Sequence, residues 1–112
     1  MDREEEQERL ARAFKALGDV HRLRALRFIA GGAPPGADRD DAVCACHVQD
    51  HLELSQPATS YHLKVLREAG LVDAEKRGRW VHYRISAEGL EALQAFLGEI
   101  DDAARERPEV FA

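Results

Sequence analysis

Cysteine, tryptophan and long apolar runs are scarce in this chain of 112 residues, which has two cysteines and one tryptophan. No apolar run approaches the roughly 18 residues that a membrane-spanning helix needs, so we expect no membrane partner. The first residues are acidic and polar, unlike a secretory signal peptide, and we expect a cytoplasmic location. Because no Ser/His/Asp set and no phosphate-binding loop stands out, the sequence argues against an enzyme.

Charge is distributed unevenly along the chain, whose formal net charge is −5. This value argues against indiscriminate nucleic-acid binding, although it leaves room for a local basic patch. Between Ser55 and Ile85 there are six Lys or Arg and three acidic residues, a local balance of +3 (6 − 3). The length suits a single domain over residues 1–112, with a flexible tail from about 106. Glycine and proline make residues 31–41 a loop, to which we assign no role.

Residues 55–72 organise the rest of the chain. Ser55 suits an N-cap, Pro57 falls in the first turn, and Gly70 is expected to end the helix. Apolar residues at helical spacing mark a buried side, which leaves four polar residues on or near an outward face: Gln56, Thr59, Ser60 and His62. Short polar groups at the start of a helix suit the reading of base edges in a DNA major groove, although an ordinary amphipathic helix has the same pattern.

The next stretch, residues 73–85, is predicted to be a β-hairpin. Val81, Tyr83 and Ile85 alternate along the chain and share one strand face, and Gly78 supplies the turn. The tip carries three basic residues: Lys76, Arg77 and Arg79. A helix followed by a hairpin with a basic tip is the layout of a winged helix-turn-helix, so the predicted fold class is mainly α with a β-hairpin wing.

These residues carry a family resemblance. The run Ser55-Gln56-Pro57, Ser60 and His62 to Val72, followed by Arg77-Gly78-Arg79 and Tyr83, closely resembles the ArsR/SmtB family of bacterial metal-responsive repressors. The resemblance covers roughly residues 8–104. It implies a repressor that binds double-stranded operator DNA, with the DNA-binding residues Ser55, Gln56, Pro57, Thr59, Ser60, His62, Lys64, Arg77, Arg79 and Tyr83.

Three further helices are predicted around this region. Residues 3–17 form the first, Asp19 caps a second whose buried side holds Leu23, Leu26 and Ile29, and Ser86 caps the last. The first and last helices carry more apolar surface than one small domain easily covers. In the family these two helices form the interface of a homodimer, although packing within the chain is the alternative. The expected interface residues are Leu10, Phe14, Leu93, Phe96, Leu97 and Ile100.

The two cysteines are separated by one residue, as Cys44 and Cys46. In a reducing cytosol such a pair indicates a metal or redox site before a structural disulfide, although two small buried apolar residues are the alternative. Residues 42–54 are expected to form a short extended entry followed by the first helix of the helix-turn-helix. On an ideal helix the two cysteine side chains point apart, so either Cys44 lies outside the regular helix or the helix distorts on binding. The helix N-terminus is expected to lower the thiol pKa.

The surrounding residues resemble the arsenic sensor motif of the family, Leu-Cys-x-Cys-Asp-Leu, and imply As(III) or Sb(III) as the effector. Some members place a third cysteine where this chain has Gln49, and trivalent arsenic prefers three thiolates. His47 and His51, spaced to share a helix face, are further candidate ligands, which would give a site for Zn²⁺ or another divalent ion. A surface or DNA-facing His51 is the alternative. The last helix has no histidine, so the zinc site that other members place there is absent.

Two other interpretations stay open for the cysteines. The first is a repressor of the same fold that senses an oxidant or persulfide, although an i, i+2 disulfide would be strained. The second is a small thiol oxidoreductase or metal carrier. That class lacks its usual Cys-x-x-Cys here and leaves residues 55–84 unexplained.

Overall fold

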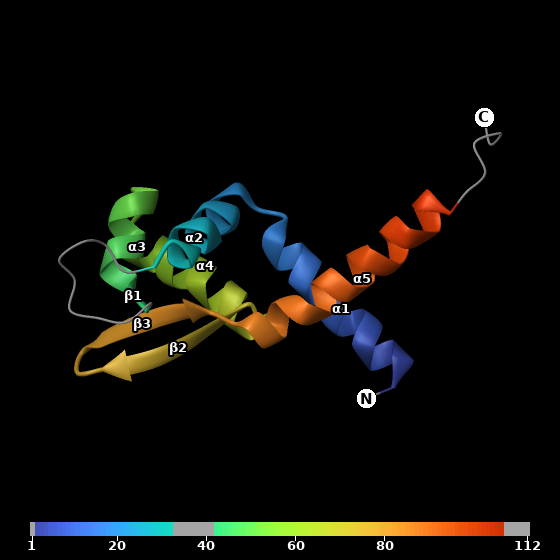
Figure 1. Ribbon diagram of the computed structural model, residues 1–112. Helices are drawn as coiled ribbons and strands as arrows, with labels where there is room; N and C mark the ends of the chain where they lie inside the picture. The colour runs from blue at the N-terminus through green and yellow to red at the C-terminus, as the bar shows by residue number, and fades with distance from the viewer. Residues whose placement is uncertain (1, 33–41, 107–112) are drawn as a thin grey trace.

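The computed structural model describes residues 2–32 and 42–106 as mostly helical, with a small antiparallel sheet (Figure 1). The predicted loop at 31–41 and tail from about 106 therefore fall largely outside the described residues. No helix among the described residues is long and apolar enough to span a bilayer. In chain order the elements are α1 (Arg3–Leu17), α2 (Val20–Ala30), β1 (Val43–Cys44), α3 (Ala45–Leu52), α4 (Gln56–Glu68), β2 (Val72–Arg77), β3 (Trp80–Ile85) and α5 (Ala87–Arg105).

Side-chain caps set the starts of the helices as predicted. The Asp19 carboxylate accepts the backbone N–H of His21 at 2.8 Å and that of Arg22 at 3.2 Å. The Ser55 hydroxyl accepts from the N–H of Ala58 at 3.2 Å, and Ser86 caps α5 in the same manner. These bonds satisfy N–H groups that the first turn of a helix leaves without partners. After α4, Gly70 adopts the left-handed conformation (φ 79°) that glycine tolerates.

The sheet has the strand order β1-β3-β2 and is antiparallel throughout. The hairpin register runs from Val72 opposite Ile85 to Arg77 opposite Trp80, and Gly78 makes the turn with φ 65°. The two-residue strand β1 pairs with the other edge of β3, which places Cys44 opposite His82. The segment that carries the cysteines is therefore joined to the hairpin by sheet pairing.

The core lies where α2, α3 and α4 pack on one another and on the sheet. Leu63 and Leu66 of α4 are buried, as their spacing predicted. On α2, however, Leu23 is 49% exposed, so its prediction as a buried residue is wrong. Ala25 fills the buried side in its place. The most deeply buried large side chains are Ile29, Val43, Val48, Leu63, Leu66, Leu71 and Val72.

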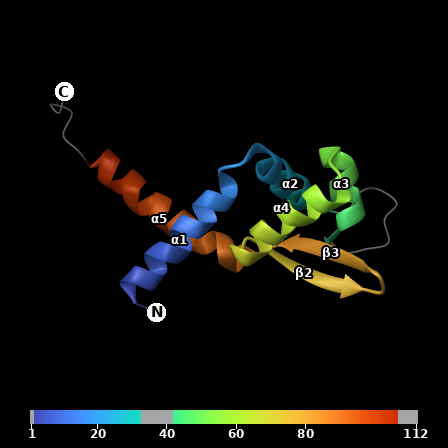
Figure 2. The ribbon, with the colours of Figure 1, turned by 180° about the vertical axis from the view of Figure 1, so that it is seen from behind.

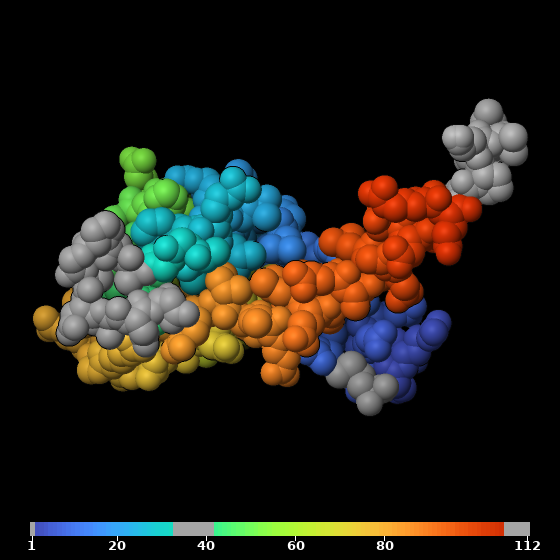
Figure 3. Space-filling view, in the orientation of Figure 1, coloured from blue at the N-terminus to red at the C-terminus, as the bar shows by residue number. Residues whose placement is uncertain are grey.

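Helices α1 and α5 cross each other at one end of the molecule, and the hairpin tip lies at the other end (Figures 1 and 2). Phe14 and Phe96 meet edge to face, with ring centroids 5.7 Å apart. Beyond this crossing the second half of α5 extends away from the body (Figure 3), and the molecule is 57 Å long. Phe96, Leu97 and Ile100 are 37%, 53% and 53% exposed, so this apolar stripe is largely uncovered in one chain.

Candidate nucleic-acid interface and thiol site

The outward face of α4 is polar and accessible. Gln56, Ser60 and Lys64 are exposed along it, and Ser55 and Pro57 are exposed at its start. A helix that projects its N-terminal polar side chains from the body can enter a major groove, where amide and hydroxyl groups reach base edges. Of the residues in this segment that are predicted to contact DNA, the structure exposes five together: Ser55, Gln56, Pro57, Ser60 and Lys64.

Thr59 does not lie on that face. It is 2% exposed, and its hydroxyl has no hydrogen-bond partner among the described residues, so the prediction that it faces outward is wrong. Tyr61 takes the outward position instead, with 59% of its surface exposed. Tyr61 lies four residues after Pro57 and three before Lys64, and this helical spacing was the signal that the sequence offered.

His62 is half-buried and points toward α2. Its Nδ1 lies 3.1 Å from Nη1 of Arg22, and its ring centroid lies 5.5 Å from that of His21. Burial lowers the pKa of His62, and the positive charges of Arg22 and His21 act in the same direction, whereas Asp19 opposes them. The structure thus gives His62 a contact within the protein, which its sequence position did not predict.

The wing presents Arg79 and Lys76 to solvent near the tip. The guanidinium of Arg79 lies 5.5 Å from the centre of the Trp80 ring, within the range of a cation–π contact. Tyr83 is half-buried next to β1, and burial raises the pKa of its hydroxyl. Of the predicted wing residues, Arg79 is therefore the best placed to contact a DNA backbone.

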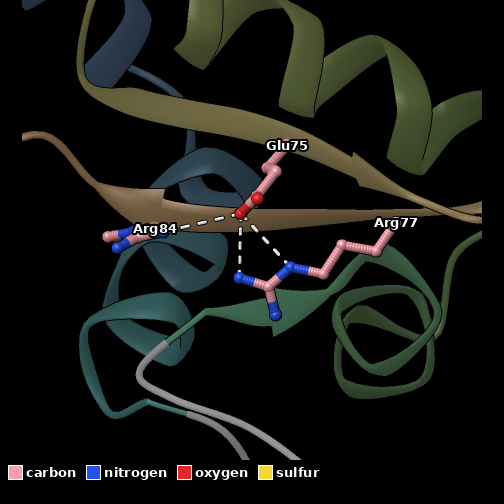
Figure 4. Close-up of polar contacts among 3 residues, drawn as sticks. All are labelled: Glu75, Arg77 and Arg84. Atoms are coloured by element: carbon pink, nitrogen blue, oxygen red, sulfur yellow. Dashed lines mark hydrogen bonds and ion pairs between the residues drawn. The ribbon is translucent and has the colours of Figure 1, made fainter.

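Arg77, by contrast, is held by a carboxylate on its own strand (Figure 4). One oxygen of Glu75 accepts hydrogen bonds from Nε of Arg77 at 3.2 Å and from Nη2 at 2.8 Å. The same oxygen lies 3.7 Å from Nη2 of Arg84. Glu75 thereby neutralises part of the positive charge that the sequence placed in the wing.

The two cysteines are adjacent in space as well as in sequence. Cys44 ends β1 and caps α3, so it lies outside the regular helix as predicted. Its sulfur lies 2.6 Å from that of Cys46 and 3.4 Å from the backbone N of Cys46, and both thiols are free. The change from strand to helix between them lets two side chains at i and i+2 converge.

The acidity of these thiols differs from the expectation. Burial raises the pKa of Cys46 to about 11, and the neighbouring Cys44 thiol adds to the increase. The backbone N–H of His47 lowers it only in part. The prediction that the helix N-terminus lowers the thiol pKa is therefore wrong for Cys46, because burial and the second thiol outweigh the helix end.

The two histidines of α3 do not complete a metal site in this conformation. Within residues 2–32 and 42–106, no three His, Cys, Asp or Glu side chains are grouped so that they could hold one ion. His51 is exposed and stacks on Phe28 of α2, with ring centroids 4.3 Å apart. The Nδ1 of His47 is buried without a hydrogen-bond partner in the described part of the chain. Within the part of the chain that the structure describes, the two sulfurs are thus the donors that converge.

A groove of about 480 Å³, here called the wing groove, connects these parts. It lies between α3, α4 and β3. Cys46 lines it together with Gln56 and Ser60 of α4 and with Arg79 and Trp80 of the wing. One of the two thiols therefore shares a surface with the residues expected to contact DNA.

Comparison with known proteins links this geometry to bacterial regulators. The family model described as "Bacterial regulatory protein, arsR family" matches residues 39–74. The chain is 39% identical over 93 residues to an arsenic resistance transcriptional regulator of Pseudomonas putida, covering 83% of this chain and 66% of that protein. It is 31% identical over 80 residues to the arsenical resistance operon repressor of Bacillus subtilis, covering 71% and 69%. A cadmium resistance regulatory protein of Listeria innocua is 32% identical over 72 residues, covering 64% and 54%.

Solved structures show the same fold. An ArsR-like transcriptional regulator from Rhodococcus superposes with a TM-score of 0.73 at 27% identity, covering 89% of this chain and 84% of that one. A homodimeric winged helix-turn-helix DNA-binding domain from Mycobacterium bovis superposes with a TM-score of 0.64 at 24% identity, covering 95% and 90%. The predicted winged helix-turn-helix fold is confirmed.

Proposed function

The chain belongs to the ArsR family of DNA-binding transcriptional regulators, and we propose that it is a homodimeric repressor that releases its operator when arsenite or antimonite binds Cys44 and Cys46. Release would derepress resistance genes. The proteins it resembles are regulators rather than enzymes. A cytoplasmic location is part of the proposal.

The observation that carries this proposal is the position of Cys46 in the wing groove, beside Gln56, Ser60 and Arg79. A ligand held by the two thiols would lie against both the recognition helix α4 and the wing. It could therefore distinguish a DNA-competent arrangement of these two elements from an incompetent one, which is the condition for coupling between two sites.

Two adjacent sulfurs suit a soft, thiophilic ligand. Thiolates prefer soft acceptors, and the sulfurs of Cys44 and Cys46 already lie 2.6 Å apart. Because Gln49 stands where some members have a third cysteine, we propose that a hydroxide or a solvent thiol supplies the third donor. Near neutral pH arsenite is the neutral hydroxide As(OH)₃, so each of the two thiol protons would leave as water together with one displaced hydroxide. No net proton is then released, in contrast to the binding of a divalent ion by thiols.

The cap of α3 gives a physical route for the response. The Cys44 sulfur accepts a hydrogen bond from the backbone N–H of Cys46. If that sulfur coordinated an effector, its lone pairs would be shared with the effector and the hydrogen bond would weaken. The first turn of α3 would then shift, and α3 packs directly on α4. Couplings of this kind are typically about 1–3 kcal/mol, or roughly 5- to 150-fold in DNA affinity.

Dimerisation is proposed from the exposed stripe on α5. Leu97 and Ile100 leave apolar surface uncovered on an element that extends from the body, and the Mycobacterium bovis neighbour is described as homodimeric. A two-fold dimer would present two α4 helices to successive major grooves, about one helical turn of DNA apart. The operator is accordingly expected to have approximate two-fold symmetry.

The test follows the anisotropy of labelled DNA from the protein's own promoter with reduced protein. We expect arsenite or antimonite to release the DNA and to change the emission of Trp80, which lines the wing groove. Cys44→Ser and Cys46→Ser should keep DNA binding and lose the response. Ala45→Ser is the matched control, because it adds a hydroxyl between the cysteines and leaves both sulfurs in place.

Two outcomes would contradict the proposal. If the two serine variants still released DNA on addition of arsenite, the effector site would lie elsewhere. If the wild-type protein bound none of the promoter DNA, the repressor function itself would fail.

A second candidate effector is a divalent ion such as Zn²⁺ or Cd²⁺, favoured by the similarity to the cadmium regulator and by the buried Nδ1 of His47. Release by Zn²⁺ alone, lost in His47→Gln, would support it. An oxidant or persulfide is the remaining alternative, since the thiols are adjacent. A loss of two hydrogens by mass spectrometry after oxidant treatment, without metal, would identify that chemistry.

A further inference from the structure

A second groove borders α4 on the side away from the wing groove. It measures about 230 Å³ and lies between α1, α2 and α4. Arg12 and Lys15 of α1 and Arg22 of α2 line it, together with Tyr61 and Glu68 of α4. Three cations and one carboxylate give it a formal charge of +2 (3 − 1), within a chain whose net charge is −5. We call it the α1 groove.

The position of the α1 groove relative to α4 suggests its partner. With about 3.6 residues per turn, Gln56 and Ser60 lie along one border of the outward face and Tyr61 along the other. The first border opens on the wing groove, and the second opens on the α1 groove. A helix in a major groove about 12 Å wide has one phosphate backbone on each side. Two grooves that flank the recognition helix, each lined by arginine, match this arrangement.

The cations of the α1 groove sit on well-packed elements. Arg22 is fixed by a hydrogen bond from Nε to the carbonyl oxygen of Ala16 at 2.7 Å and by its contact with His62. Arg12 and Lys15 lie three residues apart on α1 and therefore project from the same side of that helix. Because α1 packs against α2 and α4, the backbone that carries Arg12 and Lys15 is already in place beside the recognition helix, and only their exposed side chains need to become ordered on a phosphate.

We propose that the α1 groove binds the phosphate backbone of the operator strand on the side of α4 opposite the wing, with Arg12 and Lys15 as the contacts. The inference rests on the proposed DNA-binding function and extends the footprint beyond the recognition helix and wing. Backbone contacts fix the register of a protein on DNA and carry no base preference of their own.

The experiment measures binding of the full chain to its promoter DNA and to an unrelated duplex over a range of salt concentrations. Arg12→Gln and Lys15→Gln should each weaken binding to both duplexes by the same factor and lower the salt slope by about one. Arg3→Gln is the matched control, since it removes the same charge from α1 outside the groove. Glu68→Gln should strengthen binding to both duplexes, because it removes the carboxylate from the groove.

Three results would overturn the inference. The first is a pair of groove variants that match Arg3→Gln while the wild-type protein binds normally, which would leave the repressor proposal intact. The second is an effect confined to the promoter sequence, which a phosphate contact cannot produce. The third is a wild-type protein that binds no duplex, which would remove the proposed function as well. Circular dichroism and sedimentation should show that both groove variants keep the wild-type fold and assembly.

Discussion

Arg22 donates a hydrogen bond from Nη1 to Nδ1 of His62 over 3.1 Å. A guanidinium has no acceptor, so the ring nitrogen must accept, and His62 is neutral with its proton on Nε2. The same arginine donates from Nε to the carbonyl oxygen of Ala16. One side chain on α2 therefore joins the recognition helix to the helix that crosses α5.

Acidification should weaken this connection. Burial, together with Arg22 and His21, lowers the pKa of His62 in the folded protein below its ordinary value near 6.5, although Asp19 pulls it upward. The unfolded chain then binds more protons than the folded one as pH falls below about 6.5. The contribution of neutral His62 to the free energy of unfolding is therefore fully present above about pH 6.5, and it is lost as the pH falls through the lowered pKa. Urea unfolding at several pH values from 7.5 to 5 should show this loss, and His62→Gln should reduce it. A pH dependence unchanged by His62→Gln would contradict the prediction.

Gly89 is expected to be intolerant of any side chain. A Cβ at this position would overlap the carbonyl oxygen of Gly70, because the first turn of α5 packs directly on the turn after α4. We expect Gly89→Ala to destabilise the fold by at least about 1–3 kcal/mol, the usual cost of overpacking. Gly98→Ala, on the same helix, meets no heavy atom within 4 Å and should stabilise by up to about 1 kcal/mol. Thermal unfolding of both variants checks the contrast, and equal effects would refute it.

Glu75 should restrain DNA binding by the wing. Its carboxylate holds Arg77 at 2.8 Å, where a DNA phosphate would otherwise compete for the guanidinium. Because exposed ion pairs contribute about 0.2–1 kcal/mol, Glu75→Gln should tighten binding by about fivefold or less. Asp73→Asn removes the same charge from the same face of β2 and serves as the reference for the general effect of charge. Anisotropy titrations at fixed salt would show no difference between the two variants if Arg77 does not contact DNA.

The exposed stripe of α5 should hold the dimer together. Replacing both Leu97 and Ile100 by lysine removes two apolar side chains, each contributing about 1.5–3 kcal/mol when buried. The dissociation constant of the dimer should then rise by about 100-fold or more, which sedimentation equilibrium can measure. Ala95→Lys, on the other side of α5, should leave the assembly unchanged. A double variant that sediments like the wild type would show that the dimer uses another surface.

Local signals in the sequence were sufficient to predict where helices start, where the hairpin turns, and that Cys44 lies outside its helix. Ser55 and Ser86 cap helices, Gly78 makes the turn, and Cys44 precedes its helix, because each depends on neighbouring residues alone. The prediction that Thr59 faces outward, where the structure instead exposes Tyr61, failed for a different reason. The phase of α4 about its axis is set by what the helix packs against, which polarity alone does not determine.

Long-range relationships could not be predicted in the same way. The strand β1 has only two residues, and its partner β3 lies far along the chain, so no periodic pattern in the sequence predicts their pairing. The contact of Glu75 with Arg77 is local, two residues apart on β2, but the sequence analysis did not predict it either. A sum of charges does not say which of them neutralise one another. The raised pKa of Cys46 depends on burial by elements that a linear reading does not bring together.

The strand order β1-β3-β2 also has a consequence for biosynthesis. Cys44 is synthesised well before His82, the residue of β3 that lies opposite it in the sheet. Until the ribosome has released β3, the segment with both thiols has no strand to pair with. A nascent chain therefore presents its cysteines before its wing exists. Under the proposed function, an effector that binds the thiols at that stage would be enclosed in the protein as it folds.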